Sequence, residues 1–370
     1  MTAVAPSLRW PPSHDDKPGA VCRQFYIFSV RSYVHDFRQF LIAALRRQGN
    51  RVCHIHIGRS TYLTRDDETR SEFAGASGFV RLLRRLRVEA ASVHDPVFID
   101  STGPYTPMRS LALRAALGPG LWCYDIFDNM LYDYRGFVRL RARLAIGLLS
   151  RLSPVQLTLS GETLRLFPRA VHLDNAAHTG RIVRTSPNDR DLVLLSSIDG
   201  RLDIAFVRRV AAFAPDRCLF VYGRAASPQR LEALLRDRAN IVYRGEFSYD
   251  DIGAILAPFA VALAPYAINR LTEYINPDKY YYFLNSGMEV ISTDIPQARR
   301  MRDRIHIAQS PVDVPAIMER LRTEPASRKN TAGPVIGWDQ RASELVDIIA
   351  QARLRRLPRQ LRPEQARPAR

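Results

Sequence analysis

Residues 264–296 constrain the fold of this 370-residue chain more than any other stretch. They follow an apolar run, residues 260–264, whose composition predicts a buried strand. The stretch then predicts a helix at residues 279–286, a helix stop at Gly287 and a second strand at residues 290–293. A strand, a helix and a further strand in so short a span indicate a βαβ unit, which belongs to a parallel sheet covered by helices.

The start of that helix has the chemistry of an anion site. Asn276, Pro277 and Asp278 supply a capping side chain, a proline in the first turn and an acid beside the positive helix end. Backbone N–H groups and the ammonium of Lys279 then point at one spot, which suits a phosphate. The alternative is an ordinary buried βαβ unit with an exposed lysine.

Length and composition bound the remaining possibilities. The length favours two domains, and a hydrophobic content of 46% is enough for sizeable cores. The longest uncharged run, residues 255–269, is short and holds two prolines, so we expect no membrane span.

Residues 1–20 are Pro-rich and lack the apolar core of a signal peptide, so we expect them to be disordered and the chain to stay in the cytosol. Four widely spaced cysteines beside apolar runs predict buried free thiols and no metal or redox site: Cys22, Cys53, Cys123 and Cys218.

The net charge of +17 comes from arginine and indicates an anionic partner, which could be membrane phospholipid, nucleic acid or a phosphorylated substrate. Residues 353–370 hold seven arginines against one glutamate, so this Pro-rich tail carries +6 and the body +11. Two predicted helices, residues 79–88 and 137–152, combine arginines with apolar residues. Each fits either a core helix with a solvated basic face or a helix resting on an anionic membrane. Nucleic acid is the weaker alternative, because the arginines are not interleaved with exposed aromatics and no recognition motif is present.

The order of elements predicts two doubly wound parallel sheets. In the first half we expect strands at residues 25–30, 51–57, 97–100, 121–124, 155–159 and 170–173, with helices from residue 37 and over the two ranges above. No G-x-G-x-x-G follows the first strand, which argues against a dinucleotide site there. In the second half we expect strands at residues 192–196, 218–222, 241–244, 260–264 and 290–293, and helices at residues 203–212, 249–256, 279–286 and 337–354.

The segment PDKYYYFLNSGMEVISTDIP, residues 277–296, resembles the nucleotide-sugar site of GT-B glycosyltransferases, P-x-K-ψ-x-E-ψ-x-x-x-G-x-P-V-ψ-x-[ST], in which ψ is apolar. Two positions depart from that pattern. Tyr282 replaces the glutamate that usually holds the donor ribose, and Met288-Glu289 stand where the proline is expected. The matching positions are Pro277, Lys279, Gly287, Val290 and Thr293.

The resemblance extends over the arrangement of residues 23–350 and implies the GT-B fold, an α/β architecture of two Rossmann-like domains that face a cleft. A polar linker at residues 179–190 fits between them, and its D-x-D, Asp189 to Asp191, precedes a strand, so we attribute it to chance and expect no metal site of the GT-A kind. The implied divisions are a disordered N-terminus at 1–20, an acceptor-binding domain at 21–178, the linker, a nucleotide-sugar-binding domain at 191–330, a crossover helix at 331–352 that returns to the first domain, and a basic tail at 353–370.

The resemblance also assigns roles in donor binding. The departing diphosphate must be stabilised, and without a metal this falls to cations and backbone N–H groups. Lys279 is the best candidate and Arg224, after the turn at Gly223, the next, although Arg224 could be a plain surface arginine. The family places the nucleotide base near Gly245 and Phe247, and Tyr282 could donate a weaker hydrogen bond to the ribose. The expected donor site is therefore Lys279, Arg224, Gly223, Gly245, Phe247, Tyr266, Asp278 and Tyr282.

The catalytic base is expected in a loop at the carboxyl end of a parallel strand. YDIFD, residues 124–128, resembles the YRASD-like segment of the xanthan glucuronosyltransferase, in which the last aspartate is the base, and this implies Asp128. Asp125 and the pair His35-Asp36 in the first loop compete for the role. The E-x7-E of common retaining GT-B enzymes is absent, because the position eight residues after Glu273 is a tyrosine, and this favours inversion.

Together these features imply a metal-independent, inverting bacterial glycosyltransferase with no cofactor beyond its nucleotide-sugar substrate. We expect it on the cytoplasmic face of the cell membrane, where it would build a surface polysaccharide or glycolipid on a lipid-linked or glycan acceptor, without binding nucleic acid. A GT-B-shaped, non-catalytic partner remains an alternative, because the loss of the ribose glutamate permits it.

Overall fold

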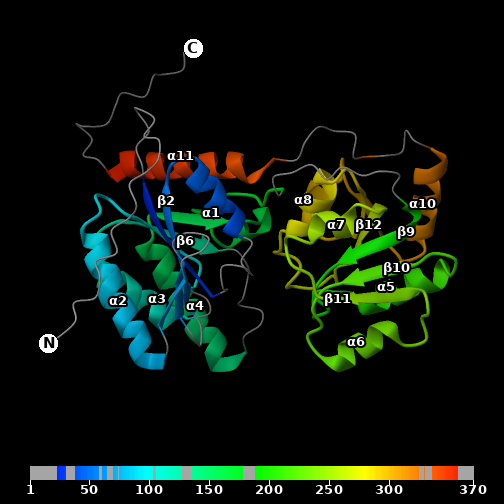
Figure 1. Cartoon of the computed structure of the whole chain (residues 1–370), viewed down its shortest axis with the longest axis horizontal. Helices are drawn as coiled ribbons and strands as arrows, with labels where there is room; N and C mark the ends of the chain where they lie inside the picture. The colour runs from blue at the N-terminus through cyan, green and yellow to red at the C-terminus, as the bar shows by residue number, and fades with distance from the viewer. Residues whose placement is uncertain are drawn as a thin grey trace, which may run out of the picture.

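The computed structural model describes residues 23–30, 38–57, 61–64, 70–73, 75–102, 106–126, 135–177, 188–324, 329 and 336–356. Within these ranges the strands form two sheets, which lie in two halves of an elongated molecule (Figure 1). Helices cover both faces of each sheet. The expectation of two Rossmann-like units, here called the N-terminal and C-terminal domains, is confirmed.

The N-terminal domain contains an eight-stranded sheet in the order β4-β3-β2-β1-β5-β6-β7-β8. Six of the strands pair in parallel, whereas β3 and β4 form an antiparallel edge beside β2 that the sequence analysis did not predict. The strands are β1 Gln24–Ser29, β2 Arg51–Ile57, β3 Thr61–Thr64, β4 Arg70–Phe73, β5 Val97–Asp100, β6 Leu121–Ile126, β7 Val155–Thr158 and β8 Val171–His172.

Side chains that alternate along these strands fill two separate cores, because successive residues point to opposite faces of a sheet. Phe25 and Ile27 face α1 (Arg38–Arg47) and the last helix, α11 (Trp338–Arg356). Tyr26 and Phe28 face α2 (Gly75–Ala91) and α3 (Pro107–Leu117). Tyr124 and its neighbours on β6 pack against α4 on that second face. The helices of this domain are α1 Arg38–Arg47, α2 Gly75–Ala91, α3 Pro107–Leu117 and α4 Gly136–Leu152, with a short 3₁₀ helix η3 at Gly161–Arg165.

The last helix, α11 Trp338–Arg356, lies across the N-terminal domain although it follows the C-terminal one (Figure 1). Trp338, Leu345 and Ile349 pack into the core beside α1. Arg47 forms an ion pair with Asp339 of α11 at 2.8 Å. The helix therefore ties the end of the described chain back to its beginning.

The C-terminal domain contains a six-stranded, fully parallel sheet in the order β11-β10-β9-β12-β13-β14. Its strands are β9 Asn188–Leu195, β10 Leu219–Tyr222, β11 Ile241–Gly245, β12 Phe259–Ala264, β13 Glu289–Thr293 and β14 His306–Ala308. Its helices are α5 Ile204–Phe213, α6 Pro228–Leu235, α7 Ile252–Leu256, α8 Asp278–Asn285, α9 Pro296–Arg300 and α10 Asp313–Thr323.

Two local expectations need correction. The D-x-D does not precede a strand but lies within β9, where the Asp191 carboxylate accepts the backbone N–H of Cys218 at 2.8 Å. Helix α7 begins at Ile252 and not at Tyr249, because Asp251 accepts hydrogen bonds from the N–H and hydroxyl of Ser248 and holds the intervening residues in a turn.

None of the cysteines that the structure describes takes part in a disulfide bond. Cys53 and Cys123 are buried, as expected, whereas Cys218 is only half-buried, and Cys22 lies outside the described residues. Burial raises the pKa of the Cys123 thiol to about 12, which keeps it protonated. No helix in the described part of the chain has the length and apolar character needed to cross a membrane.

Candidate functional site

The two domains touch through a cluster of amide side chains. Asn276, in the loop between β12 and α8, donates from Nδ2 to the carbonyl of Leu159 (2.8 Å) and to Oδ1 of Asp174 (2.9 Å), both in the N-terminal domain. In return, Nδ2 of Asn175 donates to the Asn276 carbonyl at 2.7 Å. These contacts place the start of α8 at the domain boundary, on the carboxyl side of β12.

Helix α8 is buried along most of its length, from Tyr280 to Leu284. Its three consecutive tyrosines, Tyr280, Tyr281 and Tyr282, are all buried. The Tyr280 hydroxyl bonds to Ser292 of β13, and the Tyr281 hydroxyl accepts from Asn276 at 3.2 Å. Tyr282 turns toward α7, with its ring centre 6.2 Å from that of Tyr249, and its buried hydroxyl has no hydrogen-bond partner in the described structure.

Lys279 lies in the first turn of α8, one quarter exposed, with Nζ 3.2 Å from Oδ1 of Asp278. Asp199, in the loop after β9, belongs to the same patch. Burial alone would raise the pKa of the Asp199 carboxyl, but the hydrogen bonds and charge of Arg201, with the charge of Lys279, outweigh it and lower that pKa. Two cations, two carboxylates and the first N–H groups of a helix thus meet at the carboxyl ends of β9 and β12, where an added phosphate would compete with the carboxylates for the cations.

Gly223 and Gly245 are brought together, since the Gly223 N–H donates to the Gly245 carbonyl at 2.7 Å. Gly223 has φ +140°, and a Cβ there would lie 2.0 Å from the carbonyl oxygen of Ser196, so only glycine fits this approach. Gly245 also has positive φ, +89°, but a Cβ there would meet no atom within 4 Å. Open space therefore lies beside Gly245. Arg224 is exposed, and its carbonyl accepts the N–H of Ile198 at 2.8 Å.

Phe247 and Tyr266, two further expected donor residues, belong to or pack against the core of the C-terminal domain. Phe247 is half-buried against the cluster formed by α7, α8 and the adjoining strands. Tyr266 is buried, with its ring edge-on to Tyr280 at 6.0 Å. Burial raises the pKa of the Tyr266 hydroxyl, and the neighbouring charges of Asp278 and Asp199 add to the effect. All eight expected donor residues thus lie on the C-terminal domain, but the hydroxyls of Tyr266 and Tyr282 are inside the protein and not on an open surface.

The three expected catalytic residues, His35, Asp36 and Asp128, lie outside the described residues. The described competitor is Asp125, near the end of β6, which is buried and ion-paired with Arg38 at the start of α1. Its Oδ2 accepts from Nε of Arg38 and from the hydroxyl of Ser101, each at 2.8 Å. This geometry makes Asp125 a structural link between β6, the start of α1 and the residue after β5, and not a free base.

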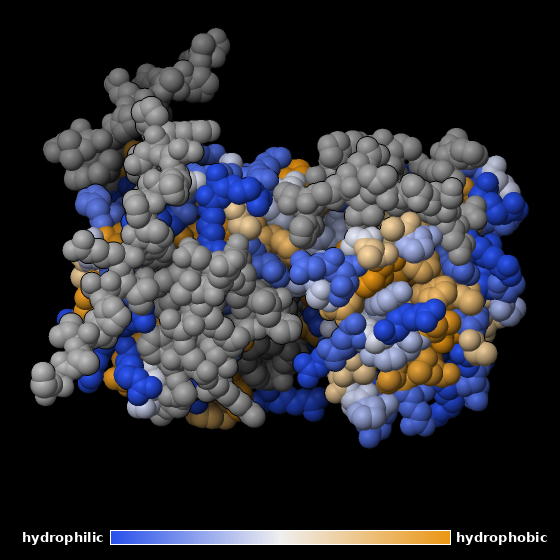
Figure 2. Space-filling view, in the orientation of Figure 1, coloured by the Kyte–Doolittle hydropathy of each residue, from blue (hydrophilic) through white to orange (hydrophobic). Residues whose placement is uncertain are grey.

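A cavity of about 690 Å³ opens between the domains, and the sequence analysis did not anticipate it. Its lining combines η3 of the N-terminal domain with residues 268–273 and 294–300 of the C-terminal domain, and it includes Arg165, Arg270, Arg300, Glu162 and Glu273. Arg300 reaches across the boundary, so that a Cβ on Gly161 would lie 1.3 Å from its Nη1. The space-filling view shows a hollow between the two halves (Figure 2). Its walls come from segments over 100 residues apart, so the only local sign of it in the sequence is the pair Arg299-Arg300.

Within the ranges that the structure describes, no group of three or more histidine, cysteine, aspartate or glutamate side chains is placed to hold a metal ion.

No protein-family model matches the chain, and no curated protein matches its sequence. Solved structures do match it. AviGT4, a glycosyltransferase involved in avilamycin A biosynthesis, gives a TM-score of 0.58 at 12% identity over 89% of this chain and 97% of that one. Anabaena HepE, crystallised with UDP and glucose, gives 0.56 at 13% identity over 90% and 99%. A Listeria monocytogenes protein assigned as a UDP-N-acetylglucosamine 2-epimerase gives 0.52 at 10% identity over 92% and 98%.

The chain spans 61% of the length of TarM, a further match with a TM-score of 0.54 at 10% identity over 80% of this chain. At these identities the likeness establishes the fold, which is GT-B, and leaves the activity to be argued from the site.

Proposed function

We propose that this GT-B chain is a glycosyltransferase that moves a sugar from a nucleotide-sugar donor to a lipid-linked or polysaccharide acceptor. The observation that carries the proposal is the start of α8, where Lys279 lies at a helix N-terminus beside the domain boundary and the carboxyl end of β12. In open α/β sheets this edge is where ligands bind, and a helix start with a lysine suits a diphosphate. HepE, which shares the fold, was crystallised with UDP and glucose.

The donor would lie along the carboxyl ends of β9 to β12. Its diphosphate would meet the first turn of α8 and displace Asp278 from Lys279, with Arg224 as a second cation. The open space beside Gly245, next to Phe247, would take the nucleoside. Developing negative charge on the leaving diphosphate would then be stabilised by cations and backbone N–H groups, which is the metal-independent route.

The acceptor would enter from the N-terminal domain and occupy the cavity between η3 and α9. A base must sit within hydrogen-bond reach of its hydroxyl, and Asp128 in the loop after β6 remains the proposed residue, with His35 and Asp36 as alternatives. Direct displacement by that hydroxyl would invert the configuration of the transferred sugar.

The proposed location is the inner face of the cell membrane, with the protein bound peripherally in the cytoplasm. The supporting observations are the net charge of +17 and the arginine-rich helices of the N-terminal domain. Anionic phospholipid attracts such surfaces, whereas the described helices offer none of the nucleic-acid motifs.

The test is a thermal-shift panel of UDP-, GDP-, dTDP- and CMP-sugars on the purified full chain, followed by proton NMR of the sugar products. We expect one nucleotide class to raise the melting temperature, and its sugar to be transferred, or slowly hydrolysed when no acceptor is present. Conversion of the donor sugar to its C2 epimer would instead identify an epimerase, the activity assigned to the Listeria neighbour. Binding without any turnover would favour the non-catalytic partner, and no binding by any member of the panel would refute the proposal.

A further inference from the structure

Helix α4 has two apolar faces, whereas a surface helix normally has one. Ile146 and Leu149 are buried against β6, and Ala142 is buried as well. On the opposite side of the helix a second apolar row is exposed. It is called the α4 stripe here and consists of Phe137, Leu140, Leu144, Leu148 and Leu152. Its members recur every three or four residues, so they share one side, and Phe137 and Leu144 are 78% and 67% exposed.

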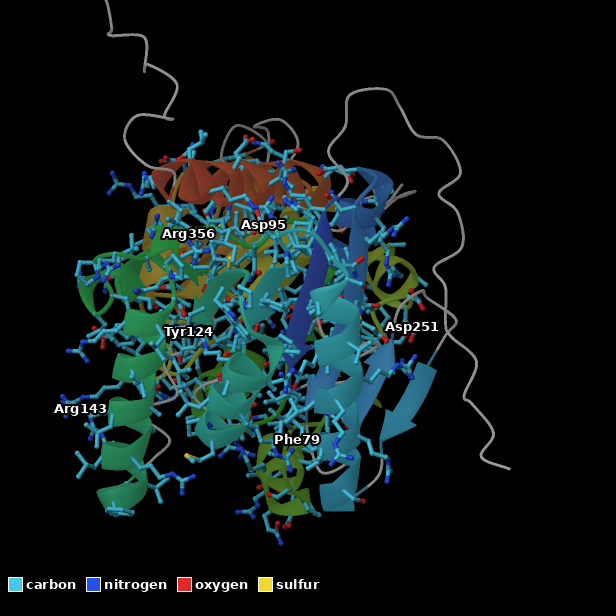
Figure 3. The ribbon with its side chains drawn as sticks, turned by 90° about the vertical axis from the view of Figure 1, so that its left-hand side faces the viewer. Phe79, Asp95, Tyr124, Arg143, Asp251 and Arg356 are labelled. Carbon is cyan, nitrogen blue, oxygen red and sulfur yellow. The ribbon has the colours of Figure 1, made fainter. Side chains whose placement is uncertain are left out.

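The charge around the α4 stripe is of one sign. Residues 135–152 contain five arginines and no aspartate or glutamate. Arg141 and Arg143 are exposed on the same helix as the stripe, and Arg143 points away from the sheet into solvent (Figure 3). An apolar row bordered by cations is typical of a helix that lies in the interface of an anionic bilayer.

Helix α2 provides an internal comparison, because the sequence analysis gave it the same two alternatives. Its large apolar residues Leu82 and Leu86 are fully buried, and Phe79 and Leu83 pack against the same core. Its exposed large hydrophobic residues are valines, of which Val88 is 73% exposed. The arginines of α2 therefore form a solvated face on a core helix, and the same sequence pattern has different structural meanings in α2 and α4.

We propose that the α4 stripe and its flanking arginines dock the protein on a phospholipid bilayer that contains anionic lipid. A contiguous exposed apolar row is seldom left uncovered, and five arginines without an acid select a partner of high negative charge density. The proposal specifies the surface for the membrane location proposed above. Its test needs no donor or acceptor, so its failure and that of the proposed transferase activity are distinguishable.

The first experiment places a reporter in the stripe. Phe137→Trp is made in the full chain, and its fluorescence is measured with vesicles of phosphatidylcholine, with or without phosphatidylglycerol, whose acyl chains are brominated. The native tryptophans that the structure describes, Trp122 and Trp338, are buried and form the background. We expect a blue shift and quenching only with phosphatidylglycerol present, and neither in the matched control, Val88→Trp on α2. Equal signals from the two variants, or no quenching of Phe137→Trp, would overturn the proposal.

The second experiment removes the stripe and measures vesicle co-sedimentation. Leu144→Ser with Leu148→Ser should weaken partitioning by about tenfold for each leucine, and Arg141→Gln with Arg143→Gln by about fivefold for each arginine. Arg84→Gln with Arg87→Gln, on the exposed face of α2, should have the smaller effect because that face lacks an apolar row. If the serine variant instead separates a dimer of the protein alone and leaves vesicle binding unchanged, the stripe is an interface between copies and the proposal is wrong.

Discussion

Replacing Lys279 gives the sharpest test of the proposed donor site. The ammonium is one quarter exposed and already shares its charge with Asp278 at 3.2 Å. Both features reduce the free energy that the ammonium contributes to phosphate binding. The binding free energy lost on replacing Lys279 should therefore be near the lower end of the range for a charge-assisted hydrogen bond, about 2 kcal/mol. Because 1.4 kcal/mol corresponds to a tenfold change, Lys279→Met should weaken binding of the diphosphate by about 30-fold.

The assay is isothermal titration with the nucleoside diphosphate selected by the thermal-shift panel. The chain has three lysines, and Lys329 offers a matched control because its ammonium donates to the carbonyls of Arg302 and Ile305 in the same domain. Lys329→Met should lower stability but leave the dissociation constant unchanged. Lys279→Arg should recover most of the lost affinity, since it restores the cation.

Two results would refute this reasoning. Unchanged diphosphate affinity in Lys279→Met would remove Lys279 from the phosphate site. An equal loss for the nucleoside monophosphate and diphosphate would show that the lysine does not contact the leaving phosphate.

Three further predictions follow from the same structure. Gly223→Ala, whose Cβ would clash with the Ser196 carbonyl, should lower the free energy of unfolding in urea by about 3 kcal/mol. Gly245→Ala, which causes backbone strain but no clash, should lower it by about 1 kcal/mol. Asp128→Asn should cut turnover by about 10²–10⁴-fold while calorimetry shows donor binding nearly intact, and loss of both together would contradict its assignment as base. The lowered pKa of Asp199 means that its pairing with Arg201 stabilises the folded state above the ordinary carboxyl pKa and that this stability is lost as the pH falls through the lowered value. The difference in unfolding free energy between wild type and Arg201→Met should therefore shrink in acid, and a constant difference would contradict the ion pair.

Most of the parallel strands could be predicted because their buried residues form apolar runs between turns. The short edge strand β14, His306–Ala308, could not be predicted in this way. The antiparallel edge could not, since Thr61–Thr64 and Arg70–Phe73 are short and mostly polar. The start of α8 was visible in the sequence because proline, acid and lysine act locally there.

Long-range pairings were not accessible in this way. The link between Arg38 and Asp125 spans 87 residues, so nothing in either local sequence shows that Asp125 is buried and paired. The burial of Tyr282 depends on the position of α7, and the cavity beside Arg300 depends on the docking of the two domains. Helices α2 and α4 have the same pattern of arginine and leucine, and only their packing distinguishes a core face from an exposed one.

The central claim is that a nucleotide-sugar diphosphate binds at the start of α8, in the cleft between the domains. Amide hydrogen exchange of the full chain, with and without a saturating amount of the selected nucleoside diphosphate, tests it most directly. The account predicts slower exchange at residues 278–280, 223–224 and 245–247, with no change on α4. Protection confined to other segments, or none at saturation, would contradict it.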